Sequence, residues 1–148
     1  MMEEKEETET ESEALAGKRL LLAEDDRLCG EILCELLEDE TGRPVSIAAN
    51  GRAALEMFES ANGEYDAIIM DVQMPVMNGY EAARAIRRSG CGNAKTVPII
   101  ALTADASEES ARSAADSGMN GCLAKPVNID RLRKAVAAAL KSLSVAYR

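Results

Sequence analysis

The sequence predicts an α/β protein of the doubly wound class, in which a five-stranded parallel sheet is covered by helices on both faces. Short apolar runs alternate with longer amphipathic segments, so each run and the segment after it make one strand–helix unit. The runs are apolar throughout, as is typical of strands that are buried on both faces. A length of 148 residues suits a single domain.

The composition limits the classes of partner and compartment. A net charge of −9 argues against binding to nucleic acid or to an anionic membrane, but it is compatible with a cationic patch on a partner protein. The chain has no apolar run that could span a bilayer and no signal-peptide pattern, so we expect a cytoplasmic location. The four cysteines lack metal-binding spacing and should be reduced thiols. The sequence contains no histidine, which excludes any mechanism that needs a histidine of this chain.

The start of the chain divides into a tail and a first strand–helix unit. Residues 1–16 are rich in Glu, Thr and Ser, so we expect a disordered acidic tail before a folded domain at 17–148. A strand is predicted at 18–23, where three leucines and an alanine run into acidic residues. The helix expected at 27–38 would have Asp26 as its N-cap. Its apolar residues recur at helical spacing and predict one inward face: Leu28, Cys29, Ile32, Leu33, Leu36 and Leu37.

The second and third units repeat this alternation. Residues 44–48 are a short strand after a Thr-Gly-Arg turn, and an Asn-Gly pair leads into a helix at 52–60. The strand at 66–70 should be deeply buried, because Ala, Ile, Ile and Met follow one another in it without a polar break. Pro75 closes the next loop, since proline cannot extend a central strand. A second Asn-Gly pair precedes the helix predicted at 80–88.

The last two units complete the pattern. A strand is predicted at 98–101, with its proline tolerated near the start, and a polar helix is predicted at 107–116. Gly118 ends this helix, and a strand at 120–124 follows and stops at a Lys-Pro pair. The final helix, expected at 129–143, is rich in alanine and has leucine and valine at helical spacing.

Polar side chains follow four of the strands, at the edge where the carboxyl ends of a parallel sheet meet. They are Glu24, Asp25 and Asp26 after the first strand, Asp71 after the third, Thr103 after the fourth and Lys125 after the fifth. Crowded carboxylates repel one another, and Mg²⁺ is a cation that suits such oxygen ligands. A metal, an ammonium and a hydroxyl around Asp71 would let this carboxylate attack a phosphoryl group. A plain surface cluster of ion pairs is the alternative, but equivalent positions on successive units favour a site.

Four motifs resemble, in this order, the receiver domains of two-component response regulators. They are Leu-Leu-Ala-Glu-Asp-Asp, Met-Asp-Val-Gln-Met-Pro-Val-Met-Asn-Gly, Ile-Ala-Leu-Thr-Ala and Leu-Ala-Lys-Pro-Val. They look most like receivers of hybrid sensor histidine kinases, over about residues 18–144. The resemblance implies a flavodoxin-like sheet with strand order 2-1-3-4-5. It also implies a phosphorelay domain that takes a phosphoryl group from a phosphohistidine, with Mg²⁺, and switches conformation. The partner would be a sensor histidine kinase or a histidine phosphotransfer protein.

By position, the resemblance implies roles for three residues in the phosphoryl transfer. Asp71 is the expected phosphoacceptor, Thr103 the switch hydroxyl and Lys125 the phosphate-binding cation. The bond between Lys125 and Pro126 resembles one that is usually cis. The chain departs from the family at Cys122, where receivers usually carry Tyr, Phe or His. A cysteine is too small to act as a rotating aromatic switch, and we expect it to be a small buried thiol.

The resemblance also implies a set of metal ligands. Asp25, Asp71 and the backbone carbonyl of Gln73 are expected to bind Mg²⁺ directly, and Glu24 is expected to act through a water molecule. Asp26 matches the position after the acidic pair, and its role is left open.

Two other functions fit parts of the pattern. A phosphatase or mutase of the haloacid-dehalogenase type also phosphorylates an aspartate at a strand end, but it has a second aspartate where this chain has Gln73. A degenerate receiver that only binds partners would lack Asp71, Lys125 or the acidic pair, and all are present. We therefore expect a phosphoacceptor signalling domain that is not an enzyme and catalyses only its own phosphorylation and dephosphorylation.

Overall fold

The computed structural model describes residues 15–105 and 107–146, with side chains up to residue 141. The strands are β1 (Leu20–Ala23), β2 (Ser46–Ala48), β3 (Ala67–Asp71), β4 (Ile99–Thr103) and β5 (Gly121–Ala124). The helices are α2 (Arg27–Thr41), α3 (Gly51–Ser60), α4 (Gly79–Arg88), α5 (Glu108–Asp116) and α6 (Ile129–Ala146). All ten predicted elements are present, and their ends differ from the predicted ones by at most three residues. None of the helices described combines the length and the hydropathy that crossing a bilayer requires.

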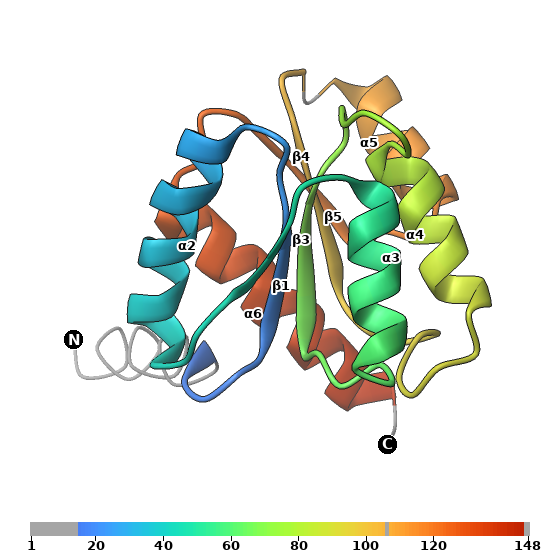
Figure 1. The fold of residues 1–148 in the computed structure, drawn as a ribbon, viewed down its shortest axis with the longest axis horizontal. Helices are drawn as coiled ribbons and strands as arrows, with labels where there is room; N and C mark the ends of the chain where they lie inside the picture. Colours follow the sequence, from blue (N-terminus) through green and yellow to red (C-terminus); the bar gives the residue numbers. More distant parts are fainter. Residues whose placement is uncertain (1–14, 106, 147–148) are drawn as a thin grey trace.

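The strands form one parallel sheet in the order β2-β1-β3-β4-β5, which confirms the predicted flavodoxin-like topology. Leu22 of β1, for example, lies between Ile47 of β2 and Ile69 of β3. Helices α2 and α6 cover one face of the sheet, and α3, α4 and α5 cover the other (Figure 1). Because all strands are parallel, their carboxyl ends meet at one edge, at the top of Figure 1.

The sheet separates two apolar cores, because successive side chains of a strand point to opposite faces. In β3, Ile68 and Met70 pack in the core under α3, α4 and α5, whereas Ala67 and Ile69 pack in the core under α2 and α6. Phe58, the single phenylalanine of the chain, is fully buried in the first of these cores. β3 is therefore buried on both faces up to and including the carboxylate that ends it.

Polar residues start the helices that leave the carboxyl edge. Asp26 accepts a hydrogen bond from the amide of Cys29 at 3.1 Å, which confirms it as the N-cap of α2. Asn78 caps α4 in a reciprocal arrangement with Glu81. Such bonds satisfy first-turn amides that have no partner within the helix. They therefore define where the loops at this edge end.

Helix α2 buries a different face from the predicted one. Leu33 and Leu37 are buried, but the rest of the predicted inward face is exposed: Leu28, Cys29, Ile32 and Leu36. The prediction was wrong for these four residues. The apolar arc of α2 is wider than one contact surface, so the ridge of Leu33 and Leu37 packs on the sheet and the neighbouring ridge faces away.

One core residue lies before the predicted start of the folded domain. Of the predicted tail, residues 1–14 lie outside the described part of the chain. Leu15 is buried and belongs to the same core as Leu33 and Leu37. The amide of Gly17 donates to the carbonyl of Thr41 at 2.7 Å. Leu15 therefore covers one end of this core, although the polar composition of residues 1–16 had predicted a tail without core contacts.

Arg87, near the end of α4, joins three segments at the amino edge of the sheet. Its guanidinium donates to the carbonyls of Ala94 and Gly118 and to the side chain of Asn120, at 2.7 to 3.0 Å. Each of these acceptors is uncharged, and burial lowers the pKa of Arg87. Asn120 also accepts from the amide of Ile99 at 2.8 Å. The loop before β4 and the turn before β5 are thereby fixed to α4.

Candidate functional site

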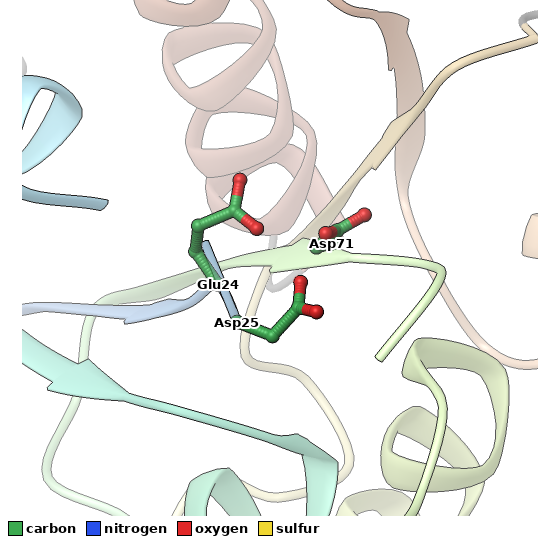
Figure 2. Close-up of side chains that lie close together, drawn as sticks. All are labelled: Glu24, Asp25 and Asp71. Atoms are coloured by element: carbon green, nitrogen blue, oxygen red, sulfur yellow. The ribbon is translucent and has the colours of Figure 1, made fainter. Parts of the chain in front are cut away.

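Three carboxylates meet at the carboxyl edge of the sheet. Glu24 and Asp25 follow β1, and Asp71 ends the neighbouring strand β3. One carboxylate oxygen of each residue lies within 4.8 Å of the others. Figure 2 shows the three carboxyl groups around a common space. Glu24 and Asp71 are buried and Asp25 is exposed, so the group opens to solvent on one side.

Lys125 supplies a cation to this group from the end of β5. Its Nζ lies 3.0 Å from Oε1 of Glu24 and 2.9 Å from Oδ2 of Asp71. Its amide donates to the carbonyl of Thr103 at 2.8 Å, which holds the end of β5 beside β4. The bond to Pro126 is cis, as the resemblance implied. One ammonium thus faces three carboxylates, and negative charge remains in excess.

The pKa of Glu24 is raised to about 7. Burial is the largest cause, and the neighbouring Asp71 carboxylate adds to it, whereas Lys125 acts in the opposite direction. The pKa of Lys125 is raised as well: burial alone would lower it, but the bonds to Asp71 and Glu24 outweigh burial. A further cation would favour the ionised form of Glu24. Buried carboxylate oxygens with excess negative charge therefore fit a hard divalent ion.

The raised pKa of Glu24 predicts how the stability of the metal-free protein depends on pH. When a carboxyl group has a higher pKa in the folded state, its stabilising effect is present at low pH and is lost as the pH rises through the folded value. In a chelator, the thermal midpoint should therefore fall between pH 4.5 and about 7 more steeply in the parent than in Glu24→Gln. Glu35→Gln, on the exposed side of α2, is the control and should keep the slope of the parent. Equal slopes in parent and Glu24→Gln, followed by circular dichroism, would contradict the raised pKa.

Thr103 ends β4 at the same edge, but its hydroxyl is turned toward its own loop. Its Oγ1 donates to the carbonyl of Asp105 at 3.1 Å and accepts from the amide of Asp105 at 3.2 Å. The orientation of this hydroxyl could not be read from the sequence, because it depends on the conformation of the following loop.

Asp25 and Gln73 line a hollow of about 500 Å³ beside the carboxylates. The amide of Gln73 donates to Oδ1 of Asp71 at 3.3 Å, which brings the loop backbone next to that carboxylate. Asp26 is not part of the three-carboxylate group, because its side chain accepts from the first turn of α2. The structure thus gives Asp26 the role of a helix cap, which the sequence left open.

A mostly apolar groove next to the site was missed in the sequence. It has a volume of about 510 Å³ and lies between α2 and the loop after β5, with Lys125 in its lining. Ile32 and Leu36 line it from α2, and Pro126 and Val127 line it from the loop. The wide apolar arc of α2 in the sequence could have indicated this groove. A helix that packs on a sheet buries one row of apolar side chains, and a second row then stays exposed.

Cys122 is a partly buried side chain of β5 that packs, like Tyr80, against the core under α3, α4 and α5. Burial and the charge of Asp105 raise the pKa of its thiol. A raised pKa disfavours the thiolate, and the contacts of Cys122 are those of a small packing residue. The sequence predicted a buried thiol, whereas the side chain is only partly buried, because β5 is the edge strand of the sheet.

The comparisons with known proteins agree with this geometry. Residues 20–137 match the family described as the response regulator receiver domain. The chain belongs to this family. It is 36% identical over 138 residues to probable histidine kinase 2 of Oryza sativa subsp. japonica, covering 85% of this chain and 13% of the rice protein. It is 34% identical over 118 residues to the osmosensing histidine protein kinase SLN1 of Saccharomyces cerevisiae, covering 78% of this chain and 9% of that protein. The receiver domain thus spans only a small part of these curated relatives.

Two solved receiver domains have the same fold. The receiver domain of the sensor histidine kinase PA1611 from Pseudomonas aeruginosa is 36% identical, with a TM-score of 0.72 and coverage of 85% of this chain and 99% of that chain. That structure holds a magnesium ion in the active site cleft. The receiver domain of Ssk1 from Saccharomyces cerevisiae, in a co-crystal with the histidine phosphotransfer signaling protein Ypd1, gives a match of 32% identity and a TM-score of 0.73. That match covers 82% of this chain and 88% of the solved chain.

Proposed function

We propose that Asp71 of this receiver domain accepts a phosphoryl group from a phosphohistidine on a partner protein, in a reaction that depends on Mg²⁺. The observation that carries the proposal is the grouping of Glu24, Asp25 and Asp71 around Lys125 at one edge of the sheet. Asp71 is buried and bonded to a cation, so its oxygens are held in position before a donor arrives.

The bond changes can be written for the residues present. One carboxylate oxygen of Asp71 attacks phosphorus, the P–N bond of the phosphohistidine breaks, and the imidazole keeps the electron pair. The product is an acyl phosphate on Asp71, which water later hydrolyses. The ammonium of Lys125, already bonded to Asp71, is placed to bind a phosphoryl oxygen. The hydroxyl of Thr103 would donate to a phosphoryl oxygen in place of the carbonyl of Asp105, and this exchange would move the loop after β4.

The metal ligands that we propose are Asp25, Asp71 and the backbone carbonyl of Gln73, with Glu24 bound through water. The three-carboxylate group and the hollow lined by Asp25 and Gln73 support this assignment. A bound Mg²⁺ would neutralise charge on the phosphoryl oxygens during transfer.

Mg²⁺ should stabilise the native protein through this site, because it relieves repulsion among the carboxylates. Binding to the native state alone adds about 1.4 to 2.7 kcal/mol at 10 to 100 times the dissociation constant. We expect the thermal midpoint to rise with millimolar Mg²⁺ in the parent and far less in Asp25→Asn. Asp39→Asn, exposed on α2, is the matched control and should respond like the parent. If Asp25→Asn gains as much as the parent, the ion binds elsewhere.

We propose that the phosphodonor is a sensor histidine kinase or a histidine phosphotransfer protein. Leu28, Ile32 and Leu36 form an exposed apolar strip on α2, beside the groove that leads to Lys125. A partner that covers this strip would bring its own side chains close to Asp71. The co-crystal of Ssk1 with Ypd1 is a precedent for this class of partner. The net charge of −9 argues against contact of this segment with nucleic acid or membrane.

We also propose that the domain is not an enzyme for a separate substrate. Gln73 occupies the position where a phosphatase of the haloacid-dehalogenase type has its second aspartate. The reaction of Asp71 is then limited to its own phosphorylation and dephosphorylation. The cytoplasm is the location that we propose, supported by the four cysteines, all of which are free thiols.

Incubation with acetyl phosphate and Mg²⁺, followed by intact mass spectrometry, tests the proposed function. We expect the addition of one phosphoryl group that hydroxylamine removes, as it does from acyl phosphates, and no addition in a chelator. Peptide mapping after borohydride reduction should locate the group on Asp71. Stable labelling at another residue, or no labelling with Mg²⁺ present, would contradict the proposal.

A further inference from the structure

Val76, in the loop after β3, combines an unusual backbone conformation with high exposure. Its φ is +68°, a region that favours glycine and that β-branched residues rarely adopt. The amide of Met77 donates to the carbonyl of Pro75 at 2.7 Å, so Val76 is the central residue of a γ-turn of the rare, strained kind. The side chain of Val76 is 79% exposed, so burial within the fold does not offset the strain.

The turn is held from both sides and cannot relax without disturbing the site. The amide of Gly51 donates to the carbonyl of Met77 at 3.0 Å, and a Cβ on Gly51 would lie 2.3 Å from that oxygen. The amide of Gly79 donates to the carbonyl of Val72 at 2.8 Å, and a Cβ on Gly79 would lie 2.5 Å from the carbonyl oxygen of Asp71. The strained turn therefore belongs to the same rigid backbone as the candidate phosphoacceptor.

The loop that carries Val76 forms part of the rim of the site. Residues on both sides of Val76 line the hollow that also contains Asp25. Asp71 is only 4% exposed, so a protein donor must press against the surrounding loops to bring a phosphohistidine within bonding distance. A small donor such as acetyl phosphate can enter without touching the rim. A variant that loses only a contact on the rim should therefore be impaired with the protein donor alone. A variant that is impaired in the chemistry should be impaired with both donors.

We propose that Val76 is a preformed apolar contact for a histidine phosphotransfer protein of the Ypd1 type that phosphorylates Asp71. This inference rests on the proposed function. Residues that the surrounding structure holds in a strained backbone conformation cluster at active sites and at positions that contact ligands. The rigid turn presents the side chain before the partner arrives, so no loop has to be ordered on binding. Leu28, exposed three residues after Asp25, gives the same edge a second apolar contact on the side of β1.

Phosphotransfer from phosphorylated Ypd1, compared with labelling by acetyl phosphate, tests this contact. In Val76→Asn the side chain becomes polar and tolerates positive φ better, so the thermal midpoint should stay or rise. We expect the Ypd1 concentration for half-maximal transfer to rise about three- to tenfold, as for a valine side chain that the partner covers only in part. Labelling by acetyl phosphate should stay within about twofold of the parent, because the attacking group is intact. Val76→Ile keeps a branched apolar side chain and should behave like the parent with both donors.

Three results would overturn the inference. The first is a Val76→Asn variant with the same half-maximal Ypd1 concentration as the parent. The second is an equal loss with both donors, since the turn would then act only by positioning Asp71. The third is a parent protein that acetyl phosphate labels on Asp71 but that phosphorylated Ypd1 does not. Failure of acetyl phosphate to label the parent is a different outcome, because it contradicts the proposed function and the inference with it.

Discussion

The Asp71→Asn variant takes up no phosphoryl group, either from acetyl phosphate or from a phosphorylated histidine phosphotransfer protein. The amide has nearly the size and shape of the carboxylate, and its oxygen can still accept from Lys125 or from the amide of Gln73. It is not a nucleophile toward phosphorus, so the chemistry is lost while the fold is kept. Labelling followed by intact mass spectrometry should therefore fall to background.

The matched control for this variant is Asp116→Asn. Asp116 is an exposed aspartate at the end of α5, and its replacement makes the same change of charge. It should be labelled like the parent, and both variants should show the circular dichroism of the parent. Undiminished labelling of Asp71→Asn would rule out Asp71 as the acceptor.

The Lys125→Met variant is labelled by acetyl phosphate about 100-fold more slowly than the parent, or slower still. Methionine keeps an unbranched stem but lacks the ammonium that lies 2.9 Å from Asp71 and 3.0 Å from Glu24. Negative charge on the incoming phosphoryl group is then opposed by fewer cations, and the carboxylates repel the donor. The initial rate of labelling at saturating Mg²⁺ measures this effect.

A second measurement separates loss of transition-state charge from loss of the fold. The gain in thermal midpoint with Mg²⁺ should persist or grow in Lys125→Met, because the carboxylates then have one cation fewer. Lys134→Met, on the exposed side of α6, should match the parent in both measurements. A labelling rate within about threefold of the parent in Lys125→Met would limit Lys125 to a structural role.

The positions of the candidate site residues could be predicted because each lies at the end of an apolar run. Parallel strands bring their carboxyl ends to one edge, so Asp71 and Lys125 meet although α4, β4 and α5 lie between them in sequence. The sheet order that places β3 beside β1 then groups Glu24 and Asp25 with Asp71. The pattern of runs and the direction of the strands predicted the shared edge, and the resemblance to receiver domains supplied the strand order.

The face of α2 could not be predicted, because helical spacing shows an apolar arc but not the ridge that meets the sheet. Leu33 packs inward and Ile32 faces away, although they are neighbours in the same arc. The groove beside Lys125 depends on that choice. The γ-turn at Val76 was hidden for a similar reason, since it depends on hydrogen bonds that Gly51 and Gly79 make from other parts of the fold.

The hydrogen bonds of Arg87 have a consequence for how the two edges of the sheet respond to ionic conditions. Its acceptors are neutral carbonyl and amide oxygens, so neither protonation of a carboxylate nor a bound cation removes them. The opposite edge is held by Lys125 and buried carboxylates, whose charges titrate and attract ions. Acid or metal should therefore alter the loops at the carboxyl edge, whereas the hydrogen bonds of Arg87 at the amino edge should persist. The bonds that tie α4 to the segments before β4 and β5 are thus kept under conditions that change the charges at the opposite edge.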